Sequence, residues 1–377
     1  MKNSFLKTLA ACLCLVMLLP ICGCRNEETE ALWDEAKYVR ENARLNTICE
    51  KNTTVYDGII YYYLGGRYLY YAAVDGSEAG PLCSKPECTH DSPSCWAHTN
   101  IVLNAQLMMY NGRLYWLEGD IGNYKLVSAV PGSNDRRVEQ RYEPSFWRSH
   151  MGCYSTISNG MLYLAGIGLE IHDGEPKESA FIYVQDLESG EMELVFDRDI
   201  EGLEMSALVK RYGDTIYLAM TGEDLRIIAF DIKTREVTEV ASFDGVGEFL
   251  NMVVDEGRII LAGPESIKAL DLETGVFEEL FHSTDYPSLF NDKAVLENVD
   301  MTHFRCCDYD HNLIGEWCLE DAGLTFPEST KYPLGCVDGK LFFLAEPDTG
   351  DDPNLGYLIS CVPEENRFEV VQAIPRR

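Results

Sequence analysis

The stretch YNGRLYWLEG, residues 110–119, begins with a tight turn and continues as alternating apolar residues. Asn-Gly is the strongest short signal for a β-hairpin turn, because both residues tolerate positive φ. The alternation that follows places one face of a strand inward and the other outward. Five further copies occur along the chain: YDGIIYYYL (56–64), SNGMLYLAGI (158–167), YGDTIYLAM (212–220), DEGRIILAG (255–263) and VDGKLFFLAE (337–346).

A second element follows the first after a short gap, and it has the form strand, turn, strand. The clearest copies are FIYVQDLESGEMELVF (181–196), LRIIAFDIKTREVTEV (225–240) and SIKALDLETGVFEEL (266–280). In Asp-x-x-Ser/Thr-Gly the Asp side chain accepts bonds from backbone N–H groups two residues on, and Gly allows positive φ. Together the two elements give units of about four short strands, which are too small to bury a core alone.

The spacing of the turns predicts seven units. The last gap is about twice the preceding one, and the segment 302–320 within it has the shape of the second element. A ring of such units is a β-propeller, so the fold class is all-β, most simply with seven blades. Eight blades remain open, and a sandwich pair or a β-solenoid are the alternative folds. The predicted propeller domain covers residues 51–377.

The first 23 residues have the pattern of a lipoprotein signal peptide. Lys2 and Lys7 form a basic region, residues 9–21 form an apolar run, and Ile21-Cys22-Gly23-Cys24 resembles a bacterial lipobox. Cys24 is therefore the predicted lipidation site, with an ordinary signal peptide as the alternative. Two acyl chains would anchor the chain stably to a membrane. The expected location is extracytoplasmic and lipid-anchored at the cell membrane.

Residues 24–50 read as an anchor and linker. Leu32, Ala36, Val39 and Ala43 recur at helical spacing. We expect a charged spacer with transient helix, or a short amphipathic helix that lies on the ring.

The net charge of −31 argues against a nucleic-acid partner, because phosphate binding requires clustered Lys and Arg. The signatures of hydrolase, metalloprotease and nucleotide-binding sites are missing from the sequence, and no catalytic residue is predicted. With 62 acidic residues, a carboxylate pair of the glycosidase type stays open.

One insertion interrupts the hairpins: CSKPECTHDSPSCWAH, residues 83–98. Cys83, Cys88, His90 and Cys95 supply four soft ligands, which is the set that a structural Zn²⁺ requires. The alternative is a disulfide, Cys83–Cys95 or Cys88–Cys95, in an oxidising compartment. Both interpretations give a structural staple.

A second loop, RYEPSFWRSHMGCY (141–154), gathers aromatic and basic side chains. Tyr142, Trp147 and His150 are the predicted ligand-binding residues, because aromatic rings on a propeller face can stack on sugars or clamp a peptide. The alternative is packing of the aromatic residues between blades.

Two resemblances extend this interpretation. The Leu114-Tyr115-Trp116 strand after Asn111-Gly112 resembles the hairpin of YWTD-type propellers, although Leu117-Glu118 replaces the Thr-Asp pair. The lipobox, the Asp-Gly-x-Ile-Tyr-Tyr strand and the Leu-Cys-Ser-Lys-Pro-Glu-Cys-Thr-His run resemble surface lipoproteins of anaerobic Gram-positive bacteria with a propeller-like domain. This resemblance implies a fold and a location, and it brings no activity to transfer.

The expected function is therefore a surface binding or scaffolding lipoprotein that presents a propeller face to a protein, peptide or glycan. The alternatives are a carbohydrate-active enzyme with carboxylates in the axial pocket, and a sensory or structural subunit of an envelope complex.

Overall fold

The computed structural model describes residues 33–45, 53–64, 68–90, 92–101, 106–120, 123–142, 150–172, 175–200, 206–255, 257–283, 287–289, 294–298, 303–318, 329–347 and 354–375. The predicted signal segment and Cys24 lie outside these residues. Contacts divide the chain into Met1–Asp34 and a compact unit, Glu35–Arg377. Among the described residues, no helix is both long and apolar enough to cross a bilayer.

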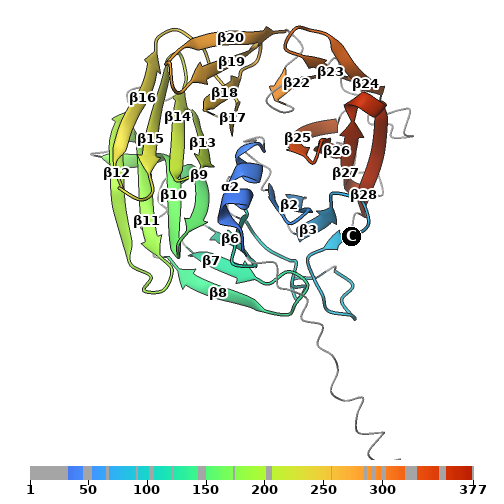
Figure 1. Cartoon of the computed structure of the whole chain (residues 1–377). Coiled ribbons are helices and arrows are strands. Elements are labelled where there is room, and N and C mark those ends of the chain that lie inside the picture. The colour runs from blue at the N-terminus through green and yellow to red at the C-terminus, as the bar shows by residue number, and fades with distance from the viewer. Residues whose placement is uncertain are drawn as a thin grey trace, which may run out of the picture. The chain divides into compact units, whose positions relative to one another are not determined.

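The compact unit is a seven-bladed β-propeller, as predicted (Figure 1). Each blade is a four-stranded antiparallel meander built from one continuous segment. Blade 1 comprises β1 (Thr53–Tyr56), β2 (Ile59–Leu64), β3 (Tyr68–Ala73) and β4 (Ala79–Pro81), and blade 2 comprises β5 (Met108–Tyr110), β6 (Arg113–Asp120), β7 (Asn123–Ala129) and β8 (Arg136–Arg141). Blade 3 comprises β9 (His150–Ser158), β10 (Met161–His172), β11 (Glu175–Asp186) and β12 (Met192–Ile200). Blade 4 comprises β13 (Ser206–Tyr212), β14 (Thr215–Thr221), β15 (Leu225–Asp231) and β16 (Val237–Phe243).

The segment between the fifth and last turn signals forms a complete blade, the sixth, as the doubled gap predicted. Blade 5 comprises β17 (Asn251–Asp255), β18 (Arg258–Ala262), β19 (Ser266–Asp271) and β20 (Phe277–His282). Blade 6 comprises β21 (Ser288–Leu289), β22 (Ala294–Asn298), β23 (His303–Asp308) and β24 (Leu313–Cys318). Blade 7 comprises β25 (Ser329–Val337), β26 (Lys340–Pro347), β27 (Asn354–Val362) and β28 (Arg367–Pro375), with a 3-10 turn at Pro363–Glu365 between its last two strands.

Turn chemistry explains why these hairpins form where they do. Asn111 and Gly112 both adopt positive φ, 46° and 71°, between β5 and β6. That pair of angles is the one a two-residue type I′ hairpin needs. The Asp turns behave as the sequence predicted: Asp186 Oδ1 accepts from the backbone N–H groups of Glu188 and Ser189, both at 2.8 Å.

The core lies between neighbouring blades, where apolar faces of adjacent sheets meet. One cluster joins blades 3 and 4 through Tyr163, Ile182, Ile216 and Phe230, all nearly inaccessible to solvent. Similar clusters join blades 4 and 5, 5 and 6, 6 and 7, and 7 and 1. Each fully buried large apolar side chain stabilises the fold by about 1.5–3 kcal/mol. The scattered cysteines Cys306 and Cys361 belong to the cluster of blades 6 and 7, in agreement with the core role predicted for most of them.

The innermost strands surround a short helix, α2 (Glu35–Ala43), which Figure 1 shows inside the ring. It contacts β1, β13 and β17. Of the two descriptions predicted for this part of the linker, the helix is therefore formed, and it lies inside the ring, against the innermost strands. The predicted boundary between the linker (residues 24–50) and the propeller domain (residues 51–377) places α2 in the linker, whereas contacts group this helix with the compact unit Glu35–Arg377. Tertiary contacts decide this position, since the isolated sequence is too short and too polar to hold a helix.

Polar contacts fix both ends of α2. At its start, Arg211 Nη2 bonds Glu35 Oε1 at 2.5 Å and Ser158 Oγ at 3.2 Å. After its end, Arg44 Nη2 lies 2.7 Å from Asp255 Oδ1. In its middle, the Tyr38 hydroxyl bonds Thr54 and accepts from the backbone N–H of Met109, both at 3.0 Å.

A buried lysine also faces the helix. Lys210 is 2% exposed, and its Nζ donates to the backbone oxygen of Asn42 at 3.3 Å. Burial disfavours the charged amine and lowers its pKa from 10.5 to about 7. The amine is therefore held near the point of losing its proton at neutral pH.

We expect Arg211→Ala to lower the free energy of unfolding by about 3 kcal/mol, because it leaves the Glu35 carboxylate without its partner inside the ring. Urea titration measures this change. Arg235→Ala is the matched control, since the Arg235–Glu193 pair is exposed and should contribute less than about 1 kcal/mol. Equal effects of the two substitutions would contradict the structural role of the axial contact.

Lys210 makes stability depend on pH in a defined direction. Between pH 7 and 10.5 the unfolded chain holds a proton on Lys210 that the folded chain has lost, so this group makes the folded state more stable as pH rises through that window. Below pH 7 Lys210 is protonated in both the folded and the unfolded state, so the free-energy cost of burying its charge no longer changes with pH. We expect Lys210→Met to flatten the pH dependence of the unfolding free energy by about 1 kcal/mol per pH unit, measured by urea titration at several pH values. Parallel curves for the two proteins would refute the assignment.

Candidate metal centre

The cysteine-rich loop leaves blade 1 after β4 and returns to blade 2 before β5. Backbone bonds attach it to the ring: Leu82 N donates to Leu69 O at 2.8 Å, and Leu69 N donates to Ala97 O at 2.9 Å. On the side of blade 2, Arg136 Nη1 donates to the backbone oxygens of Trp96 and His98 at 2.9 and 2.7 Å. Both ends of the loop are therefore held against rigid strands.

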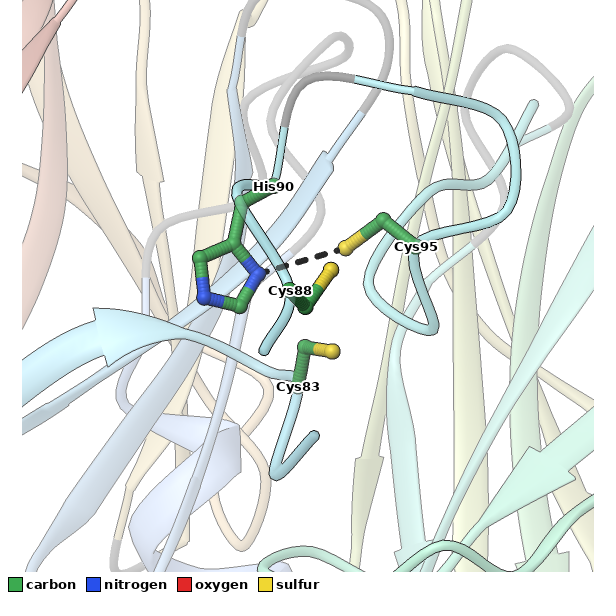
Figure 2. Close-up of side chains that lie close together, drawn as sticks. All are labelled: Cys83, Cys88, His90 and Cys95. Carbon is green, nitrogen blue, oxygen red and sulfur yellow. Dashed lines mark hydrogen bonds between the residues drawn. The ribbon is translucent and has the colours of Figure 1, made fainter. Parts of the chain in front are cut away.

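The four predicted ligands come together in this loop. Figure 2 shows the sulfur atoms of Cys83, Cys88 and Cys95 and the ring of His90 gathered around one point. The four ligand atoms all lie within 4.8 Å of one another, and His90 Nδ1 is 3.4 Å from Cys95 Sγ. In a tetrahedral zinc site with ordinary bond lengths, the sulfur–sulfur edge is about 3.8 Å and the nitrogen–sulfur edge about 3.5 Å. The four atoms are therefore close enough together to hold one metal ion.

The local backbone brings these atoms together. Single turns close at Cys88, whose N–H donates to Lys85 O at 3.1 Å, and at Cys95, whose N–H donates to Ser92 O at 3.0 Å. His90 takes a left-handed conformation, φ 55°, that turns the chain between these two ligands. Lys85 closes the loop from the other side, because its Nζ donates to Ser94 O at 3.0 Å and lies 5.1 Å from the centre of the Trp96 ring.

The environment of the thiols differs along the loop. Burial alone would raise the pKa of Cys83, but backbone hydrogen bonds from Lys85 and Trp96 to its sulfur, together with side-chain hydrogen bonds from Cys88 and Cys95, outweigh burial and hold the pKa below its usual value. Burial raises the pKa of Cys95, which is 2% exposed, to about 12. N–H groups directed at sulfur favour the thiolate, which is the form that binds a metal.

The three cysteines are free thiols, so the structure has neither of the disulfides considered from the sequence. A disulfide requires two sulfur atoms about 2.0 Å apart and would remove two of the four donors. His98 is not one of the clustered residues, and its ring packs edge-on against Tyr68, with the ring centres 5.3 Å apart. The donor set is Cys83, Cys88, His90 and Cys95, and it could hold a metal ion.

The predicted aromatic loop is only partly described. Tyr142 is 8% exposed and its hydroxyl donates to Gln185 Oε1 at 2.6 Å, which joins blade 2 to blade 3. Trp147 lies outside the described residues. His150 begins β9, and its side chain lies outside the described part of the structure. Ligand binding by these three residues stays a prediction.

Sequence reasoning missed the axial contacts of Arg211, Lys210 and Asp255. The signal that could have found them is the Lys-Arg pair inside the strand SALVKRY (206–212). Two basic residues in succession within an apolar strand put one charge on each face, and at least one of them needs a buried partner.

No protein-family model matches the chain, and no curated protein matches it. Among solved structures, the chain resembles puromycin hydrolase, with a TM-score of 0.57 and 10% identity over 92% of this chain and 57% of that one. A mutant of that enzyme complexed with PGG gives a TM-score of 0.56 at 10% identity, with 92% of this chain and 56% of that chain covered. This chain thus spans little more than half the length of those proteins. At such low identity, the likeness shows the β-propeller fold alone.

We expect His90→Ala to weaken the binding of Co²⁺, used as a spectroscopic probe, by more than about 100-fold, which exceeds the effect usual for residues outside the coordination sphere. The thiolate-to-cobalt absorption band measures occupancy under competition with a chelator. His98→Ala is the matched control and should change the affinity less than about threefold, because His98 packs on Tyr68. An equal loss in both variants would show that the set of ligands is wrong.

Proposed function

We propose that the protein is a binding or scaffolding lipoprotein, anchored through Cys24 to the outer face of a bacterial membrane, and that it presents the rim of its propeller to a protein, peptide or glycan. The observation that carries this proposal is the position of α2. A propeller whose axis holds a helix of its own offers its loops, not its axis, to other molecules. Loops on a rigid scaffold are the usual place for recognition.

The state of the axial carboxylates supports binding over catalysis. A carbohydrate-active enzyme of the predicted kind needs two free carboxyl groups that face a substrate across the axis. Glu35 and Asp255 are carboxylates inside the ring, and each forms an ion pair with an arginine. The nitrogen–oxygen distances are 2.5 Å for Glu35 and 2.7 Å for Asp255. Oδ2 of Asp255 is buried without a hydrogen-bond partner among the described residues, as are Oε2 of Glu41 in α2 and Oε2 of Glu178. The two arginines neutralise the charge of Glu35 and Asp255, so these two carboxylates are not a free catalytic pair.

We further propose that the cysteine-rich loop holds Zn²⁺ in a structural role. Three sulfur atoms and one imidazole nitrogen are soft donors that select zinc over calcium or magnesium. Four protein ligands fill a tetrahedral sphere and leave no position for a substrate or a reactive water molecule. The metal would fix the loop between blades 1 and 2 as a rigid part of the rim.

The helix also gives the proposed anchor a mechanical connection to the ring. Cys24 precedes α2 in the sequence, so a tether through its lipid reaches the propeller by way of this helix. Glu35, Tyr38 and Arg44 contact several blades, so these contacts would distribute a pulling force on the tether over the ring.

The anchor is tested by expressing the full chain in a bacterial host fed a clickable palmitate analogue. The wild-type chain and Cys22→Ser should carry the label and sediment with membranes, whereas Cys24→Ser should carry none and lose its membrane association. Cys22 is the matched control, because it stands two residues before the proposed lipidation site. Label on Cys24→Ser would refute the anchor. Release of product from a panel of glycans and peptides, instead of retention on them, would refute the binding role.

A further inference from the structure

A pocket lies between blades 1 and 2, next to the candidate metal centre. Its volume is about 280 Å³, and it is lined by residues of β2 and β3, by the end of β4, by the start of the cysteine-rich loop and by the turn at Pro131-Gly132. Ser84 Oγ bonds Asn134 Oδ1 at 3.1 Å across its edge, which ties the loop to the turn of blade 2. The volume is just below the range usual for sites that bind drug-sized ligands, so it suits one small group.

Two tyrosine rings form one wall of this pocket. Tyr61 of β2 lies directly opposite Tyr71 of β3 in the strand register, and Tyr71 lies opposite Gly80 of β4. Residues directly opposite each other share one face of the sheet, so both aromatic rings project to the same side. Gly80 has no side chain to cover the ring of Tyr71; a Cβ atom there would lie 3.7 Å from that ring.

The charge of the pocket is negative. The carboxylate of Glu78 lines it, and none of the other described residues that line it is Lys or Arg. Burial, followed by the nearby charges of Asp57 and Glu78, raises the pKa of Tyr61 well above its usual value. Both acids therefore make the potential at the aromatic wall more negative.

We propose that this pocket binds an organic ammonium cation, with the faces of Tyr61 and Tyr71 and the carboxylate of Glu78 as its three contacts. An ammonium group is attracted to the face of a tyrosine ring and most strongly where water is excluded. Pro81, Leu82 and Pro131 complete the wall with apolar surface that suits methyl or methylene groups. This inference deepens the proposed binding function, on which it rests, because it assigns that function a chemical class of ligand.

The metal centre and the pocket share a residue. Cys83 is one of the four clustered donors, and the same residue lines the pocket together with Leu82 and Ser84. A metal on Cys83 would fix this wall in place, and its removal would free residues 82–84 from Cys88 and Cys95. Ligand binding and metal binding should therefore be coupled, with the metal-loaded protein as the tighter binder.

Calorimetric titration of the full chain in detergent micelles tests the proposal with a matched pair of probes. Choline carries a trimethylammonium group, and 3,3-dimethyl-1-butanol has the same shape without the charge. We expect choline to bind about tenfold more tightly than the alcohol, the ratio that a partly desolvated cation–π site gives. Butylammonium, added as a third probe, distinguishes a primary amine such as a lysine side chain from a methylated ammonium ligand.

Substitutions localise the effect. Glu78→Gln and Tyr71→Leu should each weaken choline binding about five- to tenfold. Glu273→Gln is the control, because it removes the same charge at an exposed turn of blade 5. Unchanged urea midpoints show that the variants fold. Equal affinity for choline and the alcohol, no heat from either, or an unchanged affinity in Glu78→Gln would overturn the inference.

Metal analysis of the same samples distinguishes a failure of the pocket proposal from a failure of the metal centre that belongs to the proposed function. Zinc present with no binding of choline refutes the pocket and leaves the metal centre standing. Choline binding in a protein without zinc refutes the metal centre and its coupling, and supports the pocket as a ligand site. Where zinc is present, treatment with a chelator should weaken choline binding several-fold, and an unchanged affinity would refute the coupling.

Discussion

The seam between the first and last blades is the contact on which the whole ring depends. In the part of the chain that the structure describes, the four strands of each blade are consecutive, and no strand is borrowed across the seam to lock the ring. Side chains close it instead: Tyr62 bonds Gln372, Lys340 Nζ donates to Val74 O at 2.9 Å, and apolar residues of both blades share one cluster. Leu45, just after α2, belongs to that cluster and bridges to Gly335 of β25. The same apolar cluster therefore joins blade 1 to blade 7 and holds Leu45, which follows α2 in the chain.

The axial helix resolves a problem that a ring of inner strands creates. Those strands carry buried polar groups, Lys210, Arg211 and Asp255 among them, and each would be costly without a partner. Glu35, Arg44 and the backbone oxygen of Asn42 supply the partners from α2 and the residue that follows it. The polar contacts specify where the helix sits, while the apolar clusters between blades supply most of the stability.

The cysteine-rich loop is the largest departure from the regular repeat. Long connections without helix or strand are uncommon in compact domains, and they are usually either functional or linker segments. This loop is held at both ends by strands, brings four soft donors together and forms one wall of the Tyr61–Tyr71 pocket. A structural metal and a recognition site are therefore compatible here, since the first would make the second rigid. Rigid walls reduce the entropy lost when a ligand binds.

The sequence by itself predicted the hairpins, a ring most simply of seven blades, and the four residues that cluster in the cysteine-rich loop. Turn pairs such as Asn111-Gly112 and alternating strands act over a few residues, and Cys83, Cys88, His90 and Cys95 stand close together in the chain, so local rules suffice for both. Only the tertiary structure decided the place of α2, the Arg211–Glu35 pair and the pocket of Tyr61, Tyr71 and Glu78. Arg211 and Glu35 are 176 residues apart, and the pocket needs two blades side by side. Their neighbours are set by closure of the ring, a long-range condition that no short segment encodes.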